Sequence, residues 1–262
     1  MIIDAHSHMG PAFETKPAFL PGVSPDEIIE ILDRSGIDLT CLFAPAWEGP
    51  EFIDTEYFVA NRAIYEASKR YPERILGYAR VDPNRRQRAV DEMRRGHDEY
   101  GFRGLKLHPL WEHFLPNNMR LMAPLVELCA DYRWPIIFHT GYYPTCEPAL
   151  FVPLAERYPE VGFIIAHFGY AHVADAIVAA NLCPNIYLET SANTTATAIA
   201  QVLKEVAPSQ ILYGSDLPFT EPGDVLSKIR LQPEITEKAK AQILGQNLAR
   251  LLGIAQPVGA SP

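Results

Sequence analysis

The feature that most constrains the fold is an alternation of apolar runs with helix-like segments, repeated eight times. The apolar runs begin near Ile2, Asp38, Ile75, Arg103, Pro135, Gly162, Asn185 and Gln210. Strands that alternate with crossover helices predict a parallel sheet. Eight such units in about 250 residues predict an α/β fold of one closed (β/α)8 TIM barrel. A doubly wound open sheet is the alternative, but no Gly-rich phosphate loop follows the first run.

The helical segments have recognisable starts and stops, and they divide the chain into one domain and a tail. The segment 24–35 opens with Ser-Pro-Asp-Glu, a helix-start signal, and stops before Gly36. We expect the barrel to span residues 1–254, with a C-terminal helical extension and a Pro-containing tail at 255–262. The other helices are expected at 55–70, 85–100, 118–132, 147–158, 170–181, 195–206, 223–231 and 234–252.

Composition excludes several classes of function. The net charge of −9 argues against a protein that binds nucleic acid through a basic surface. No apolar run approaches the ~20 residues of a membrane-spanning helix, and no leader precedes the first run, so we expect a cytoplasmic protein without membrane contact. The four cysteines show no close spacing that indicates a zinc cluster or a disulfide framework. A homo-oligomer is compatible with this composition.

Side chains of metal-binding and acid/base type recur where the apolar runs end. His6 and His8 end the first run, and a strand directs residues two apart to the same side. The later runs end in Lys106 and His108 (fourth), His139 (fifth), His167 (sixth), Glu189 (seventh) and Asp216 (eighth). Because active sites of such barrels lie at the C-terminal ends of the strands, we expect these side chains to meet at one mouth.

Several of these strand ends lie in motifs that resemble those of the amidohydrolase superfamily. The matching pieces are DAHSH at 4–8, GFRGLKLHP at 101–109, FHTG at 138–141, AHFG at 166–169, YGSDLP at 213–218 and the closing ILGQNLARLLG at 243–253. More narrowly, the chain resembles the amidohydrolase-related group that includes aminocarboxymuconate-semialdehyde decarboxylase and the resorcylate decarboxylases. The resemblance covers nearly the whole chain, but it does not select a reaction.

The resemblance implies one divalent metal ion and its ligands. Carried onto matching positions, it makes His6, His8, His139 and Asp216 the ligands and His167 the acid/base residue. Three neutral imidazoles and one carboxylate suit Zn²⁺, with Mn²⁺ as the alternative, and leave a position for water or substrate. His167 and Asp216 are the expected catalytic residues. The competing hypothesis is that these polar side chains at the strand ends bind no metal and only form hydrogen bonds with one another around a water-free end of the barrel.

Lys106 leaves two hypotheses open. Some amidohydrolases carboxylate a lysine of the fourth strand and use it to bridge two metals, and a nearby metal disfavours an ammonium group. The alternative is an ordinary lysine paired with a carboxylate such as Glu189. We favour the second, because the group that the chain most resembles usually has one metal.

Aromatic residues just past the strand ends predict a pocket for a small ring. They are Phe43, Trp47, Trp111, Phe114, Tyr142, Tyr143 and Phe219. We expect Arg80, His108, Trp111 and Tyr142 to bind the substrate. Arg80 suits a carboxylate, which it can hold by two parallel hydrogen bonds. Alternatively, Arg80 pairs with Asp82 or Glu189, and His108 bonds the neighbouring loop.

These expectations define three functional hypotheses. The first is a hydrolase in which metal-activated water attacks a small cyclic or carboxylate-bearing substrate. The second is a metal-dependent non-oxidative decarboxylase. The third is a barrel that keeps a structural metal and only binds a ligand, which the acid/base histidine beside the ligand set disfavours.

Overall fold

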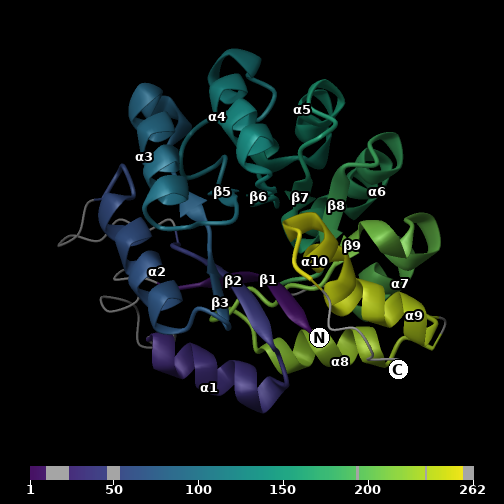
Figure 1. Cartoon of the computed structure of the whole chain (residues 1–262). Helices are drawn as coiled ribbons and strands as arrows, with labels where there is room; N and C mark the ends of the chain where they lie inside the picture. The colour runs from purple at the N-terminus through teal and green to yellow at the C-terminus, as the bar shows by residue number, and fades with distance from the viewer. Residues whose placement is uncertain (10–23, 46–53, 193–194, 234, 256–262) are drawn as a thin grey trace.

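The computed structural model describes residues 1–9, 24–45, 54–192, 195–233 and 235–255. The strands lie inside a ring of helices (Figure 1). They are β1 (Ile3–His8), β2 (Leu39–Phe43), β3 (Ile75–Gly77), β4 (Ala79–Arg80), β5 (Leu105–Leu107), β6 (Ile136–Phe138), β7 (Phe163–Ile165), β8 (Ile186–Glu189) and β9 (Ile211–Leu212). All ladders between them are parallel. The predicted (β/α)8 fold is confirmed.

The nine labelled segments make up the eight strands of the barrel, because β3 and β4 are two halves of one strand that is interrupted at Tyr78. The Tyr78 N–H donates to the Leu42 carbonyl on one side, and the Ala79 N–H donates to the Gly104 carbonyl on the other. This strand therefore joins the sheet of β1 to β3 to the sheet of β4 to β9.

Backbone hydrogen bonds also join the first strand to the chain around and beyond β9. The Ala5 N–H donates to the Tyr213 carbonyl, the His8 N–H to the Leu217 carbonyl, and the Asp216 N–H to the His6 carbonyl. A parallel bridge between Ser7 and Leu217 lies in the same seam. The barrel thus closes at the point where His6, His8 and Asp216 emerge.

The helices follow the predicted order with shifted boundaries. They are α1 (Pro25–Ser35), α2 (Phe58–Arg70), α3 (Gln87–Asp98), α4 (Met119–Tyr132), α5 (Val152–Arg157), α6 (Val173–Leu182), α7 (Ala196–Glu205), α8 (Pro222–Arg230), α9 (Glu237–Ala241) and α10 (Asn247–Leu252). The N-terminus of α1 is a complete capping box formed by Ser24 and Glu27. The predicted helix 147–158 is wrong over its first residues, which form a 3₁₀ turn between Pro148 and Phe151.

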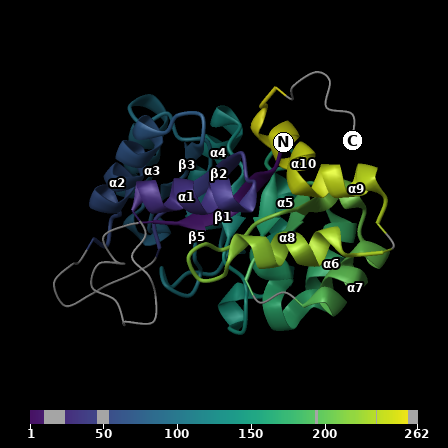
Figure 2. The ribbon, with the colours of Figure 1, turned by 90° about the horizontal axis from the view of Figure 1, so that it is seen from below.

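Apolar side chains fill the N-terminal end of the barrel interior. Interior residues of β1, β2, β6, β7 and β9 form one cluster with Leu248, Ala249 and Leu252 of α10. The C-terminal extension, in which a π-helical turn joins α9 to α10, therefore closes the N-terminal end of the barrel (Figures 1 and 2). Within the described residues, no helix combines the length and the apolar character needed to cross a membrane.

Gly77→Ala tests how tightly the loop between α3 and β5 packs on the sheet. An added Cβ would lie 2.5 Å from Cδ1 and Cε1 of the buried Phe102 ring, so we expect a loss of about 1–3 kcal/mol in the free energy of unfolding. Urea denaturation followed by circular dichroism measures it. Gly223→Ala in α8 is the matched control, because its Cβ meets no atom within 4 Å. Equal unfolding midpoints for the two variants would contradict this packing.

Candidate metal centre

The two histidines of β1 face the barrel interior because the strand carries a bulge. Ile3 packs inside the barrel, so strict alternation would turn His6 and His8 outward. Pairing with β2 shifts by one residue between positions 4 and 7, which reverses the alternation. Both imidazole rings consequently pack on the interior Phe43 ring, with centroids 5.1 and 4.8 Å away.

Three buried donor atoms form a small triangle at the mouth. His6 Nε2 lies 3.1 Å from His8 Nε2 and 3.2 Å from Asp216 Oδ1, and His8 Nε2 lies 3.1 Å from the same oxygen. An ion bound at ~2.0–2.1 Å by each donor needs donors about 3.0–3.4 Å apart. The triangle meets that spacing.

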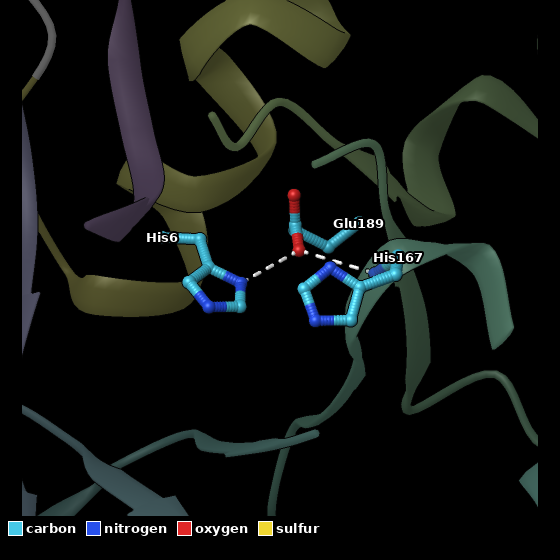
Figure 3. Close-up of side chains that lie close together, drawn as sticks. All are labelled: His6, His167 and Glu189. Atoms are coloured by element: carbon cyan, nitrogen blue, oxygen red, sulfur yellow. Dashed lines mark hydrogen bonds and ion pairs between the residues drawn. The ribbon is translucent and has the colours of Figure 1, made fainter. Parts of the chain in front are cut away.

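Glu189 orients His6 for such an ion. Its Oε2 lies 3.0 Å from His6 Nδ1 (Figure 3). That nitrogen therefore donates, and Nε2 presents a lone pair to the triangle. A carboxylate behind a metal-binding imidazole is the usual support of such ligands. Gly214 makes room for it, since a Cβ there would lie 2.1 Å from Glu189 Oε1. This donor set fits a divalent metal ion.

His139 and His167 lie beside the triangle and contact each other. His139 Nδ1 is 3.2 Å from His167 Nε2, and the His139 ring stacks on His108 with centroids 3.8 Å apart. His167 also belongs to a second group of donors, with His6 and Glu189. His139 is in neither group of close donor atoms found among the described residues, so its place as a ligand stays a prediction.

Backbone strain is concentrated at this mouth. His167, Phe168, Gly169 and Tyr170 all have positive φ, from 49° to 80°, and Asp216 has φ 63°. Positive φ is unfavourable for residues with a Cβ and clusters at functional sites. Because residues 167–170 have non-helical backbone angles, α6 begins at Val173 and not at the predicted residue 170.

Burial shifts the pKa of every ionisable group in the centre toward its neutral form. It raises the pKa of Glu189 to about 8 and that of Asp216 to about 7. It lowers the pKa of Lys106 to about 7 and that of His139 to about 3. A divalent cation would favour the ionised carboxylates and oppose their shift.

Lys106 points into the same centre without the carboxylate partner that we expected. Its Nζ lies 3.3 Å from His6 Nε2 and 4.8 Å from the centroid of the Phe43 ring. Among the described residues, no ion pair joins it to Glu189 within 4 Å. The predicted pairing with Glu189 is therefore wrong.

Arg80 is fully buried and is paired with Glu112, a residue that the sequence analysis did not consider. The guanidinium donates to Glu112 Oε1 from Nε at 3.1 Å and from Nη2 at 2.7 Å, and Nη1 donates to the Ala44 carbonyl at 2.8 Å. The predicted partners, Asp82 and Glu189, are wrong. Glu112 follows His108 in a loop, where one acid among apolar residues gave no periodic signal.

Glu112 also organises the loops around the mouth. Its Oε1 accepts a hydrogen bond from the Tyr57 hydroxyl at 2.7 Å, and its Oε2 accepts one from the His108 backbone N–H at 2.6 Å. One carboxylate thus ties the start of α2, strand β4 and the loop after β5 together.

The predicted aromatic wall is present in part. Trp111 and Tyr142 are 51% and 70% exposed, and Phe219 lies over His8 with ring centroids 5.5 Å apart. Phe114 is wrong as a wall residue, because it is buried in the core between strands and helices. Trp47 lies outside the described residues.

The sequence model of the amidohydrolase family matches residues 3–254. The chain belongs to this family. No curated protein matches the chain.

Solved structures share the fold of this amidohydrolase at low sequence identity. 5-Carboxyvanillate decarboxylase LigW from Sphingomonas paucimobilis has a TM-score of 0.77 and 15% identity, covering 97% of this chain and 99% of that one. 4-Oxalomesaconate hydratase LigJ from Rhodopseudomonas palustris has a TM-score of 0.69 and 19% identity over 97% and 96%. A dihydroxybenzoic acid decarboxylase from Polaromonas sp. JS666 has a TM-score of 0.73 and 17% identity over 97% of each chain.

His8→Ala and Asp216→Ala should each abolish metal binding by this amidohydrolase, because each removes one corner of the donor triangle. Elemental analysis of protein purified without chelator measures it, with close to one ion per wild-type chain expected. His97→Ala, at an exposed histidine, is the control that should stay loaded. Full metal content in both triangle variants would rule out this site, and two ions with added mass on Lys106 would support a bridging carbamate.

Glu112→Gln should destabilise the protein strongly, because it leaves the Arg80 charge buried without a counter-ion. Breaking such a buried pair costs about 3–5 kcal/mol. The matched control is Glu221→Gln, which breaks the exposed pair with Arg34 and should cost at most about 1 kcal/mol. Chemical denaturation of both variants measures the difference, and similar losses would show that Arg80 does not depend on Glu112.

Proposed function

We propose that this amidohydrolase is a metal-dependent, non-oxidative decarboxylase of a small ring-bearing carboxylate. The observation that carries the proposal is the triangle of His6, His8 and Asp216 with His167 beside it. The solved structures that resemble this chain include decarboxylases of 5-carboxyvanillate and 2,6-dihydroxybenzoate. These comparisons favour decarboxylation, the alternative hypothesis from the sequence, over the hydrolysis that we expected first.

The metal would be held by His6, His8, Asp216 and His139. The neighbour from Polaromonas carries bound manganese, so Mn²⁺ stands beside Zn²⁺ as the candidate ion. When bound, a divalent ion would hold substrate oxygens and stabilise the negative charge that develops during the reaction.

His167 would move the proton. Burial lowers the pKa of His167 well below its ordinary value, so the ring starts the cycle neutral and first accepts a proton from a hydroxyl group on the substrate ring. The bond between the ring carbon and the carboxyl carbon breaks, CO₂ leaves, and the electron pair stays on the ring carbon. That carbon then takes a proton from His167, and Asp216 can relay a proton beside it.

The pocket residues would select a flat substrate. Trp111 and Tyr142 are exposed at the mouth and would cover a ring, while His108 stacks on His139 next to the metal ligands. Arg80 stays a candidate for the carboxylate, but its guanidinium already binds Glu112. A substrate carboxylate would therefore compete with Glu112 for Arg80.

Incubation with aromatic carboxylates in D₂O tests the proposal. Manganese- or zinc-loaded protein is offered 2,6-dihydroxybenzoate, 5-carboxyvanillate and related acids, and CO₂ and ring deuterium are measured. We expect one deuterium on the ring for each CO₂ released. His167→Asn should keep the metal and lose about 10²–10⁴-fold in kcat, the usual contribution of a positioned acid/base group.

The same assay separates the competing reactions. Esters, lactones and amides in H₂¹⁸O report hydrolysis, for which a neutral His167 that accepts a proton from water is equally suited. Incorporation of ¹⁸O without CO₂ release would reject the decarboxylase and favour the hydrolase. Near wild-type turnover by His167→Asn would reject the role of this histidine.

A further inference from the structure

We propose that Ser191 is a positioning residue that fixes the tautomer of His167. The proposal rests on the proposed function in one respect, which is that His167 is the residue that accepts a proton. Ser191 follows β8 two residues after Glu189 and is fully buried. No sequence signal pointed to it, because it belongs to no recognised motif.

The Ser191 hydroxyl lies between the carboxylate and the acid/base histidine. Its Oγ is 2.7 Å from Glu189 Oε2 and 2.7 Å from His167 Nδ1. The Ser191 backbone N–H also donates to Glu189 Oε1, which holds the serine against that carboxylate. Glu189 Oε2 itself faces His6 on one side and the backbone of His167 on the other (Figure 3).

The direction of each hydrogen bond follows from the donor inventory. An ionised carboxylate only accepts, and a serine hydroxyl carries one hydrogen. When Ser191 donates that hydrogen to Glu189, its oxygen accepts from His167, so Nδ1 of His167 carries the hydrogen. A neutral imidazole has one N–H, and therefore His167 Nε2 presents a lone pair.

The same carboxylate gives His6 the matching tautomer directly. His6 Nδ1 lies 3.0 Å from Glu189 Oε2, so this ring also keeps its hydrogen on Nδ1. The two histidine rings differ in their nearest partner. His6 Nδ1 has the carboxylate at 3.0 Å and the Ser191 hydroxyl only at 3.3 Å, whereas His167 Nδ1 has the Ser191 hydroxyl at 2.7 Å. Loss of the hydroxyl should thus release the His167 ring, while the bond to Glu189 keeps the hydrogen of His6 on Nδ1.

The tautomer of His167 also determines the tautomer of His139. His139 Nδ1 is 3.2 Å from His167 Nε2, and a lone pair on that Nε2 requires the hydrogen to be on His139 Nδ1. The other nitrogen of His139 is then left with a lone pair. Ser191 would in this way prepare both the proton acceptor and a ring next to the donor triangle.

The test reads the tautomers without any substrate. Zinc-loaded full-length protein with ¹⁵N-labelled histidine rings is studied by long-range ¹H–¹⁵N correlation NMR, and His167→Gln identifies the His167 signals by their loss. In the wild type we expect a protonated Nδ1 and an unprotonated Nε2 on His167. In Ser191→Ala the tautomer ratio of His167 should shift toward Nε2–H by roughly two- to tenfold, the effect of one hydrogen bond.

Three controls make the result decisive. Ser191→Thr keeps the hydroxyl and should keep the wild-type pattern, Ser68→Ala removes a distant one and should change nothing, and His6 should stay protonated on Nδ1 in every variant. An unshifted His167 in Ser191→Ala would overturn the proposal. A wild-type His167 protonated on Nε2 would also overturn it, even if Ser191→Ala failed to fold.

The kinetic readout is separate from the structural one. With a substrate from the decarboxylation screen, Ser191→Ala should lower kcat by about 10- to 100-fold with little change in KM, and Ser191→Thr should restore kcat. Absence of CO₂ release from every acid would reject the decarboxylase function. The NMR result would stand regardless, so the two failures are distinguishable.

Discussion

The buried carboxylate of Asp4 joins the first strand of the barrel to the last segment, and the candidate centre depends on that junction. It accepts hydrogen bonds from the hydroxyls of Ser7 and Ser215 and from the backbone N–H groups of His6 and Ser215. A buried carboxylate needs such partners, because burial alone disfavours its charge. These bonds lie within two residues of all three donors of the triangle. The contacts that close the barrel therefore also set the spacing of the donors.

A second carboxylate, Glu189, connects the donor triangle to His167. It supports His6 directly and reaches His167 through Ser191. A third, Glu112, is used differently: it neutralises Arg80 and fixes the loop that carries His108 and Trp111. Each acid has a defined set of donors, which is the condition under which charge is tolerated inside a protein.

The polar end of the barrel interior begins where the apolar filling of the other end stops. The side chains of α10 occupy the N-terminal end together with apolar residues of the strands. The next interior positions toward the mouth carry Arg80, Lys106, His139 and Glu189 instead. Polar residues therefore begin where the apolar packing stops, and Arg80, Lys106 and Glu189 are buried there away from bulk water.

The sequence by itself determined the barrel, the order of its elements and which residue types stand at the strand ends. That was possible because the periodicity of hydrophobic residues and the signals that start a helix, such as the capping box at Ser24, depend on residues close together in the sequence. Tertiary structure alone decided the orientation of His6 and His8, since a one-residue bulge in the strand turns both side chains to the barrel interior. It also decided the partners: Arg80 with Glu112, and His167 with Ser191. Residues distant in sequence become neighbours through closure of the sheet and strained turns, and no local pattern encodes their distances.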